Sequence, residues 1–90
     1  MQIKLTERFL RDFQGLSSSL ANKCRELISE LQRVEPATLR QKALPGWRLH
    51  SLSGSNTVSL SVDMNFRMLG ELDRGALIVH RVVKHDSADR

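Results

Sequence analysis

The side chains of this 90-residue chain that are best suited to chemistry are basic groups in its second half. They lie on or just beyond segments with the pattern of β-strands: Arg67, Arg81, Lys84 and His85. Arginine suits phosphate because its planar guanidinium donates two parallel hydrogen bonds, and histidine suits proton transfer because it titrates near neutral pH. Metal-free RNA cleavage needs a base for the 2′-hydroxyl, cations for the phosphoryl charge and an acid for the leaving oxygen. These residue types therefore indicate phosphodiester chemistry.

Arg67 is the strongest phosphate candidate of this set. It stands near the start of a strand between Phe66 and Met68, so the pleat points its side chain away from both neighbours. The alternative is a structural role, either as a solvated strand arginine or in an ion pair with Asp63 or Glu71. Its position on a strand leaves both interpretations open.

His85 is the candidate for proton transfer, because it ends the last strand beside Asp86. As a general acid or base it would act together with Lys84 or Arg67, which would stabilise charge. The alternative is a His-Asp turn that closes the sheet. Adjacent residues of a strand point to opposite faces, so Asp86 need not orient the imidazole.

Arg48 and His50 form a second candidate pair, for substrate binding. They are two residues apart on the predicted strand 47–52 and therefore share one of its faces. If that face is open, the two residues bind phosphate. If it faces the helices, His50 is a buried core histidine.

Arg81 is the remaining candidate substrate contact. Its neighbour His80 is expected to be structural, because even spacing places it on the same face as Ile78 and Val82. Cys24 lies in the apolar stripe of a helix and is expected to be part of the core. No metal-ligand spacing or glycine-rich phosphate loop is present in the sequence, so neither a metal nor a cofactor is expected.

The elements that must position these residues begin with a strand and two helices. Residues 2–5 alternate between polar and apolar side chains, which predicts a short strand. Thr6 can cap the helix that follows, because its hydroxyl can accept a hydrogen bond from a free backbone N–H. Asp12 is expected on the solvent side of this helix. A second helix is predicted from about Ser19 to Val34, ending before Pro36. Apolar residues at helical spacing mark both helices: Phe9, Leu10, Phe13 and Leu16, then Leu20, Cys24, Leu27, Ile28, Leu31 and Val34.

The later half of the chain has the pattern of strands. Residues 57–63 alternate between polar and apolar side chains, which predicts a half-buried strand. Runs 66–72 and 76–84 flank Asp73-Arg74-Gly75, which predicts a hairpin. The last run is apolar almost throughout, as in an interior strand. The sequence therefore predicts an α+β fold with two layers, in which an N-terminal strand and an αα-hairpin pack on a mainly antiparallel sheet of four or five strands.

Size and charge narrow the functional classes. Residues 1–90 are expected to form a single domain, and a net charge of +4 would attract a polyanion or an acidic protein. A single cysteine suits a reducing compartment. The N-terminus has no apolar run of the length of a signal peptide or membrane span, so a cytoplasmic protein without a membrane partner is expected.

Three motifs resemble the RelE/ParE superfamily, the toxins of bacterial toxin–antitoxin pairs. They are LTERFLRDFQGL at 5–16, GWRLHSLSGSNTVSLSV at 46–62, and NFRMLGEL at 65–72 followed by VVKHDSADR at 82–90. The resemblance implies the family fold, a cognate antitoxin as partner, and in many members a cleavage site with a C-terminal tyrosine or with histidine, arginine and lysine. This chain has no tyrosine and carries Asp89 at that position, and its sequence stops at Arg90. The resemblance therefore assigns cleavage to Arg67, Lys84 and His85.

Three functional interpretations follow from the resemblance. The first is a RelE-like endoribonuclease that cuts mRNA, bound to the ribosome or free, and inhibits translation until its antitoxin neutralises it. The second is a ParE-like toxin that inhibits DNA gyrase by binding alone and needs no acid or base. The third is an inactive relative, or an unrelated small module that binds a protein. The first interpretation is the leading one, and the absence of tyrosine adds weight to the second.

Overall fold

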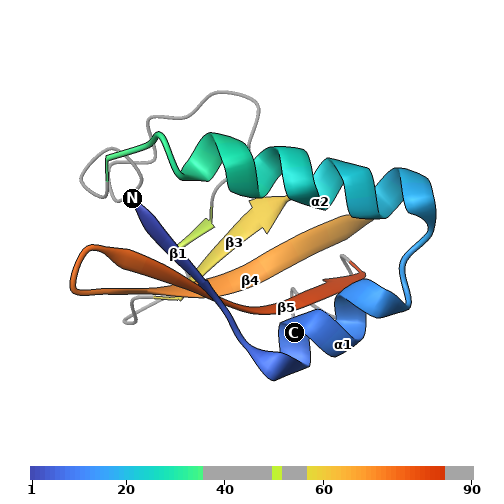
Figure 1. The fold of residues 1–90 in the computed structure, drawn as a ribbon, viewed down its shortest axis with the longest axis horizontal. Helices are drawn as coiled ribbons and strands as arrows, with labels where there is room; N and C mark the ends of the chain where they lie inside the picture. The colour runs from blue at the N-terminus through green and yellow to red at the C-terminus, as the bar shows by residue number, and fades with distance from the viewer. Residues whose placement is uncertain (36–49, 52–56, 85–90) are drawn as a thin grey trace.

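The computed structural model describes residues 1–35, 50–51 and 57–84, with side chains described for 1–35 and 57–84 (Figure 1). The elements in chain order are β1 (Gln2–Leu5), α1 (Glu7–Gln14), α2 (Ser18–Leu31), β2 (His50–Ser51), β3 (Thr57–Ser61), β4 (Phe66–Asp73) and β5 (Ala76–Lys84). The five strands form one sheet in the order β1-β5-β4-β3-β2. Among the described strands, β1 runs parallel to its neighbour β5, and the other pairs are antiparallel.

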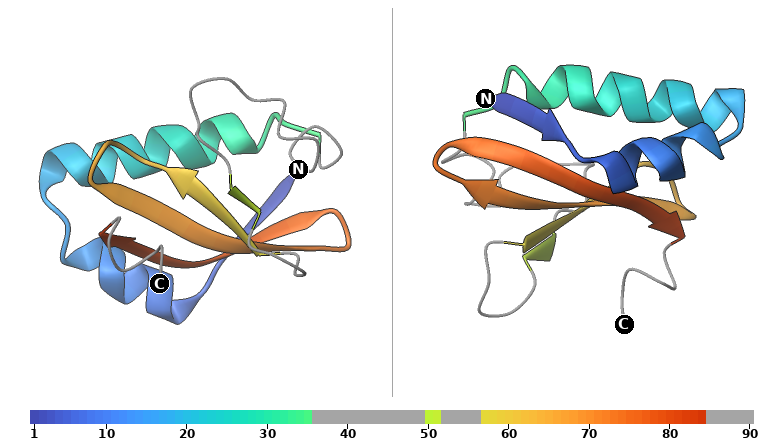
Figure 2. Two further views of the ribbon diagram at one scale, coloured as in Figure 1. Left: turned by 180° about the vertical axis from the view of Figure 1, so that it is seen from behind. Right: turned by 60° about the horizontal axis from the view of Figure 1, so that its bottom comes forward.

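The helices form the second layer of the domain. Figure 2 shows α1 and α2 together on one face of the sheet, with β2 toward the other side. The predicted α+β fold in two layers, with an N-terminal strand and an αα-hairpin on a mainly antiparallel sheet, is therefore confirmed. The predicted interior position of the last strand is also confirmed, because β5 lies between β1 and β4.

Side-chain caps determine where both helices begin. The hydroxyl of Thr6 accepts a hydrogen bond from the Phe9 N–H at 3.2 Å, as the sequence predicts, and the Ser17 hydroxyl accepts from the Leu20 N–H at 3.2 Å. These oxygens satisfy amides that have no partner within the first helical turn. The second helix begins one residue earlier than predicted and ends at Leu31 rather than near Val34.

The core lies between the helices and one face of the sheet. Eleven buried residues form its central cluster: Phe9, Cys24, Leu27, Leu31, Val58, Leu60, Met68, Leu72, Leu77, Val79 and Val82. Burial raises the pKa of the Cys24 thiol to about 11, with the charge of Asp63 contributing, so this thiol stays protonated at neutral pH. Leu10, predicted to lie in the apolar stripe, is instead 44% exposed, whereas its neighbour Phe9 is buried in the core.

The predicted hairpin joins β4 and β5 through a two-residue turn. Arg74 and Gly75 both have positive φ, at 51° and 82°. Positive φ at both central residues gives a turn whose twist matches the twist of the flanking strands. The hairpin is therefore confirmed, with Asp73 as the last residue of β4 rather than part of the loop.

A β-bulge interrupts the pairing of β4 with β5. Gly70 pairs with Val79 and Leu69 pairs with Arg81, so His80 is an extra residue on β5. A side chain at position 70 would bring its Cβ within 2.9 Å of the Ile78 carbonyl oxygen, and this explains the glycine. The bulge reverses the alternation of side chains along β5.

The predicted grouping of His80 with Ile78 and Val82 is therefore wrong for Val82, which the bulge turns to the other face. Even spacing placed it with Ile78 and Val82, but Val82 lies in the core while Ile78 is only partly buried. Among the described helices, none is long and apolar enough to cross a membrane.

Candidate functional site

The candidate site lies on the face of the sheet that the helices leave uncovered. On β4, Met68 and Leu72 belong to the core under the helices. Side chains alternate along a strand, so Arg67 between Phe66 and Met68 points to the opposite, helix-free face. On β3 the same reasoning places Ser59, which separates the core residues Val58 and Leu60, on this face.

Arg67 lies beneath the surface of this face rather than in solvent. Only 4% of the residue is exposed, and its Nη1 lies 3.5 Å from the Ser59 hydroxyl, to which it donates. Ser59 itself is 2% exposed, which differs from the solvated face that the alternation of 57–63 predicts. The two side chains cover each other across neighbouring strands. The interpretation of Arg67 as a solvated arginine is therefore wrong.

Lys84 does not share the face of Arg67. Arg67 pairs with Val83 and Lys84 pairs with Phe66, the adjacent position of the ladder. Successive pairs of a ladder point to alternate faces, so the register directs the Lys84 and Arg67 side chains to opposite sides. Lys84 is exposed at the end of β5.

The other predicted site residues are described in part or not at all. Arg48 and His85 lie outside the described residues. His50 is described by its backbone, which belongs to β2 and pairs with Ser59. The register thus places the residue His50 next to the serine that contacts Arg67.

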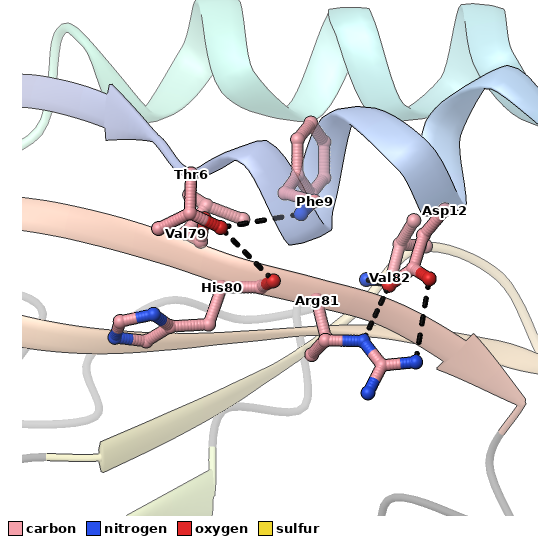
Figure 3. Close-up of polar contacts among 7 residues, drawn as sticks. All are labelled: Thr6, Phe9, Asp12, Val79, His80, Arg81 and Val82. Atoms are coloured by element: carbon pink, nitrogen blue, oxygen red, sulfur yellow. Dashed lines mark hydrogen bonds and ion pairs between the residues drawn. The ribbon is translucent and has the colours of Figure 1, made fainter.

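Arg81 is held by a carboxylate from α1. Its Nε donates to Asp12 Oδ2 at 2.6 Å and its Nη2 donates to Asp12 Oδ1 at 3.3 Å (Figure 3). The same Oδ2 accepts a third hydrogen bond, from the Val82 backbone N–H at 3.2 Å. Such a paired, charge-assisted contact orients the guanidinium plane. The predicted solvent position of Asp12 is wrong, because its carboxylate turns toward β5.

The charges of this pair stabilise each other. Burial acts to raise the pKa of Asp12, but the Arg81 and Val82 hydrogen bonds and the charges of Arg81 and Arg8 outweigh burial and lower it. The hydrogen bond to Asp12 raises the pKa of Arg81 against a small opposing effect of burial. Both groups are therefore ionised at neutral pH.

His80 extends from β5 beside Arg81. Figure 3 shows both side chains on the side of the β5 ribbon opposite α1, from which the Arg81 guanidinium still reaches the Asp12 carboxylate of α1. Neighbours at a bulge can share a side in this way. The His80 Nε2 lies 3.5 Å from Glu71 Oε2, and the imidazole side chain is 44% exposed. Of the described basic side chains on this face, His80 and Arg81 are thus more accessible than Arg67.

Sequence reasoning did not identify Asp12 and treated His80 as structural. A glycine within a strand is the signal that points to a bulge, and Gly70 carries it in this chain. No local pattern marks Asp12, because its partner lies 69 residues away. Among residues 1–35 and 57–84, no three histidine, cysteine or acidic side chains come together as metal ligands.

A second concave surface lies between the two helices. This groove has a volume of about 320 Å³ and is lined mainly by apolar side chains: Leu5, Phe9, Leu10, Phe13 and Ile28, with Arg25, Ser29 and Gln32. The Arg25 guanidinium lies 5.0 Å from the centre of the Phe13 ring, which places a positive charge at the groove. Leu5 and Leu10 remain more than two-fifths exposed.

Acid is expected to weaken the fold through Asp12. Its pKa is lowered in the folded protein, so its ionised form stabilises the fold above the unfolded pKa, and this contribution is lost as pH falls through the folded pKa. We expect Asp12→Asn to cost about 1 kcal/mol at pH 7, a value reduced for partial exposure. The difference from wild type should shrink as the pH falls below the ordinary range of aspartate, because the folded pKa of Asp12 lies below that range. Urea unfolding of both proteins at a series of pH values measures this difference in stability. A difference that stays constant with pH would contradict the prediction.

Comparisons with known proteins give structural likeness without sequence likeness. No family model and no curated protein matches the chain. A chain of the RelB-RelE antitoxin-toxin complex from Methanococcus jannaschii has a TM-score of 0.69 and 16% identity, over 96% of this chain and 94% of that chain. A chain of the E. coli DinJ-YafQ toxin-antitoxin complex has a TM-score of 0.65 and 18% identity, over 96% and 93%. The YoeB/ParE toxin from Agrobacterium tumefaciens has a TM-score of 0.65 and 16% identity, over 94% and 99%.

Proposed function

We propose that this chain, which has the fold of the RelE/ParE toxins, is the toxin of a toxin–antitoxin pair and cleaves mRNA. The observation that carries the toxin role is the likeness over nearly the whole chain to structures solved as antitoxin–toxin complexes. Cleavage is supported by the cationic side chains on the helix-free face and by the net charge of +4. We place the reaction in the cytoplasm, where mRNA is translated, with or without the ribosome.

The chemistry assigned to this site needs no metal. Arg67 would stabilise the charge that develops on the phosphoryl oxygens, and His85 would move protons between the 2′-hydroxyl and the leaving oxygen. The ladder register directs Lys84 to the other side of the sheet from Arg67, so we assign it no part in this step. Arg48, His50 and Arg81 would contact the RNA backbone. Because Arg67 is 4% exposed, substrate would reach it only after a local rearrangement of this face.

A cognate antitoxin is the proposed protein partner. Support comes from the similar structures that were crystallised with RelB and DinJ. The apolar groove between α1 and α2, with Leu5 and Leu10 exposed, offers the kind of surface that a protein partner covers. The net positive charge would favour an acidic partner segment.

The second candidate is a toxin that inhibits DNA gyrase by binding alone. Two observations favour it: the burial of Arg67 and the absence of tyrosine from the chain. Such a protein would act through its surface and would need no group for proton transfer. It differs from the nuclease in what fails first in the cell.

Expression of the chain alone in bacteria separates these functions. We expect growth to stop, new mRNA 5′ ends to appear within minutes, and coexpression of the antitoxin to restore growth. The measurements are mapped RNA ends and plasmid supercoiling from the same culture. Loss of supercoiling before any RNA cleavage would reject the nuclease in favour of gyrase inhibition, and harmless expression would indicate an inactive relative.

A further inference from the structure

We propose that the bulge in β5 makes His80 and Arg81 a joint subsite for a phosphate group of single-stranded RNA, with Asp12 as the residue that positions Arg81. This inference rests on the proposed function, since it names how the helix-free face holds its substrate. It adds a histidine and an acidic residue to the site, neither of which belongs to the set assigned to cleavage or substrate binding above.

The bulge in β5 brings two basic side chains to one side of the strand. Neighbouring residues of a regular strand point to opposite faces, so a regular β5 would separate the side chains of His80 and Arg81. The extra residue at the bulge puts both on the helix-free side, as Figure 3 shows. Bulges re-aim side chains in this way beside functional sites. Two adjacent residues thus contribute two basic side chains to one place.

The contact with Asp12 fixes the orientation of the Arg81 guanidinium. Asp12 binds the Nε and Nη2 atoms, so the contact uses one edge of the guanidinium. The edge formed by Nη1 and the remaining Nη2 proton lies away from this carboxylate, and 34% of the Arg81 side chain is exposed. A guanidinium has five N–H donors in a fixed plane. The contact with Asp12 therefore holds the free edge of the guanidinium in a fixed orientation for a phosphate. Because the Arg81 side chain is already ordered, binding loses less side-chain entropy.

Two carboxylates lie beside the basic side chains of the subsite. Asp12 faces Arg81 from α1, and Glu71 faces His80 from β4. Both lie next to a basic side chain, but only Asp12 also binds the strand backbone, through the Val82 N–H. Asp12 thus fixes a position, whereas Glu71 lies 3.5 Å from an imidazole that is charged only when protonated. The two acids are a matched pair for a test.

The test measures RNA binding by the full-length protein. The probe is a short single-stranded RNA with 2′-O-methyl groups, which lacks the nucleophile for cleavage, and fluorescence anisotropy gives its Kd. Simple electrostatics predicts tighter binding on removal of either carboxylate. We expect Glu71→Gln to bind equally or more tightly, and Asp12→Asn to bind roughly tenfold more weakly, because Arg81 loses its orienting partner. Opposite changes in Kd for the two variants would show that Asp12 acts by positioning Arg81 and not through its charge alone.

Arg81 variants provide a second route. Arg81→Gln should reduce the dependence of log Kd on log salt by about 0.7, the value for one lost phosphate contact on a single strand. The control Arg11→Gln removes an equal charge from the exposed part of α1 and should leave this slope unchanged. In an Arg81→Lys background, which keeps the charge without the planar fork, Asp12→Asn should have little further effect on Kd.

The results that would overturn the inference are specific. If Asp12→Asn keeps the wild-type circular dichroism spectrum and binds the probe as tightly as wild type, Asp12 does not position Arg81. If Asp12→Asn does not fold, an unchanged salt slope for Arg81→Gln rejects the subsite. If RNA is cleaved normally while all these variants bind as wild type does, the subsite fails and the nuclease stands. If wild type neither binds nor cleaves RNA, both proposals fail.

Discussion

Arg67→Gln is expected to abolish growth arrest and to lower the rate of RNA cleavage by roughly 100- to 1,000-fold, the cost of removing one donor that stabilises the transition state. The reason is that glutamine keeps one short amide donor but loses the positive charge and the fork that match phosphoryl oxygens. The measurement is single-turnover cleavage of an mRNA by purified protein, with and without ribosomes. Arrest of growth in cells expressing the variant is the parallel readout.

Two controls separate catalysis from folding in this experiment. Arg33→Gln removes the same charge from an exposed position after α2 and should leave cleavage within about twofold of wild type, as is usual for surface changes. Arg67→Met fills a similar volume with an apolar side chain, so it should fold while remaining inactive. Full growth arrest by a folded Arg67→Met protein would show that Arg67 has no catalytic role.

Phe9→Ala is expected to produce the largest loss of stability, about 3–5 kcal/mol in the free energy of unfolding. Phe9 is 1% exposed, belongs to the central core cluster and has its ring centre 5.9 Å from that of Phe13. Its removal leaves a cavity between α1 and the sheet, because the surrounding side chains can relax only in part. Urea denaturation followed by circular dichroism measures the change.

Leu10→Ala is the matched control for this prediction. Leu10 follows Phe9 in the same helix but is 44% exposed, so its truncation should cost less than about 1 kcal/mol. Alanine forms helix at least as well as either residue, so similar losses for both variants would mean that the buried face of α1 contributes no more than its exposed face. A small loss for Phe9→Ala alone would mean that α1 contributes little to the core.

The outline of the fold could be predicted because it depends on local signals. Alternation in 2–5 and 57–61, helical spacing in the first third of the chain, and a glycine turn between two apolar runs each act over a few residues. Thr6 caps α1 as predicted, and the turn at Arg74 and Gly75 follows from the positive φ that glycine tolerates. Because both helices precede most of the strands in the chain, they pack together on one face of the sheet.

The arrangement of the site depended on contacts distant in the chain. The burial of Arg67 needs Ser59 from the next strand, and the orientation of Arg81 needs Asp12 from the first helix. The sequence offered Arg67 and Arg81 as candidate cations by residue type, yet it did not indicate that the more accessible of the two is Arg81. It also assigned Lys84 and Arg67 to one cleavage site, whereas the ladder register directs the two side chains to opposite sides of the sheet.

The sequence by itself determined which elements form and which residue types are available for phosphate chemistry, because periodicity and side-chain chemistry are properties of short segments. Only the tertiary structure decided which cations share a surface. One extra residue at His80 reverses every side chain beyond it on β5, and a strand pattern with period two does not reveal that shift. The grouping of His80, Arg81 and Asp12 is therefore a consequence of strand register and of the packing of α1 against the sheet edge, which no local pattern encodes.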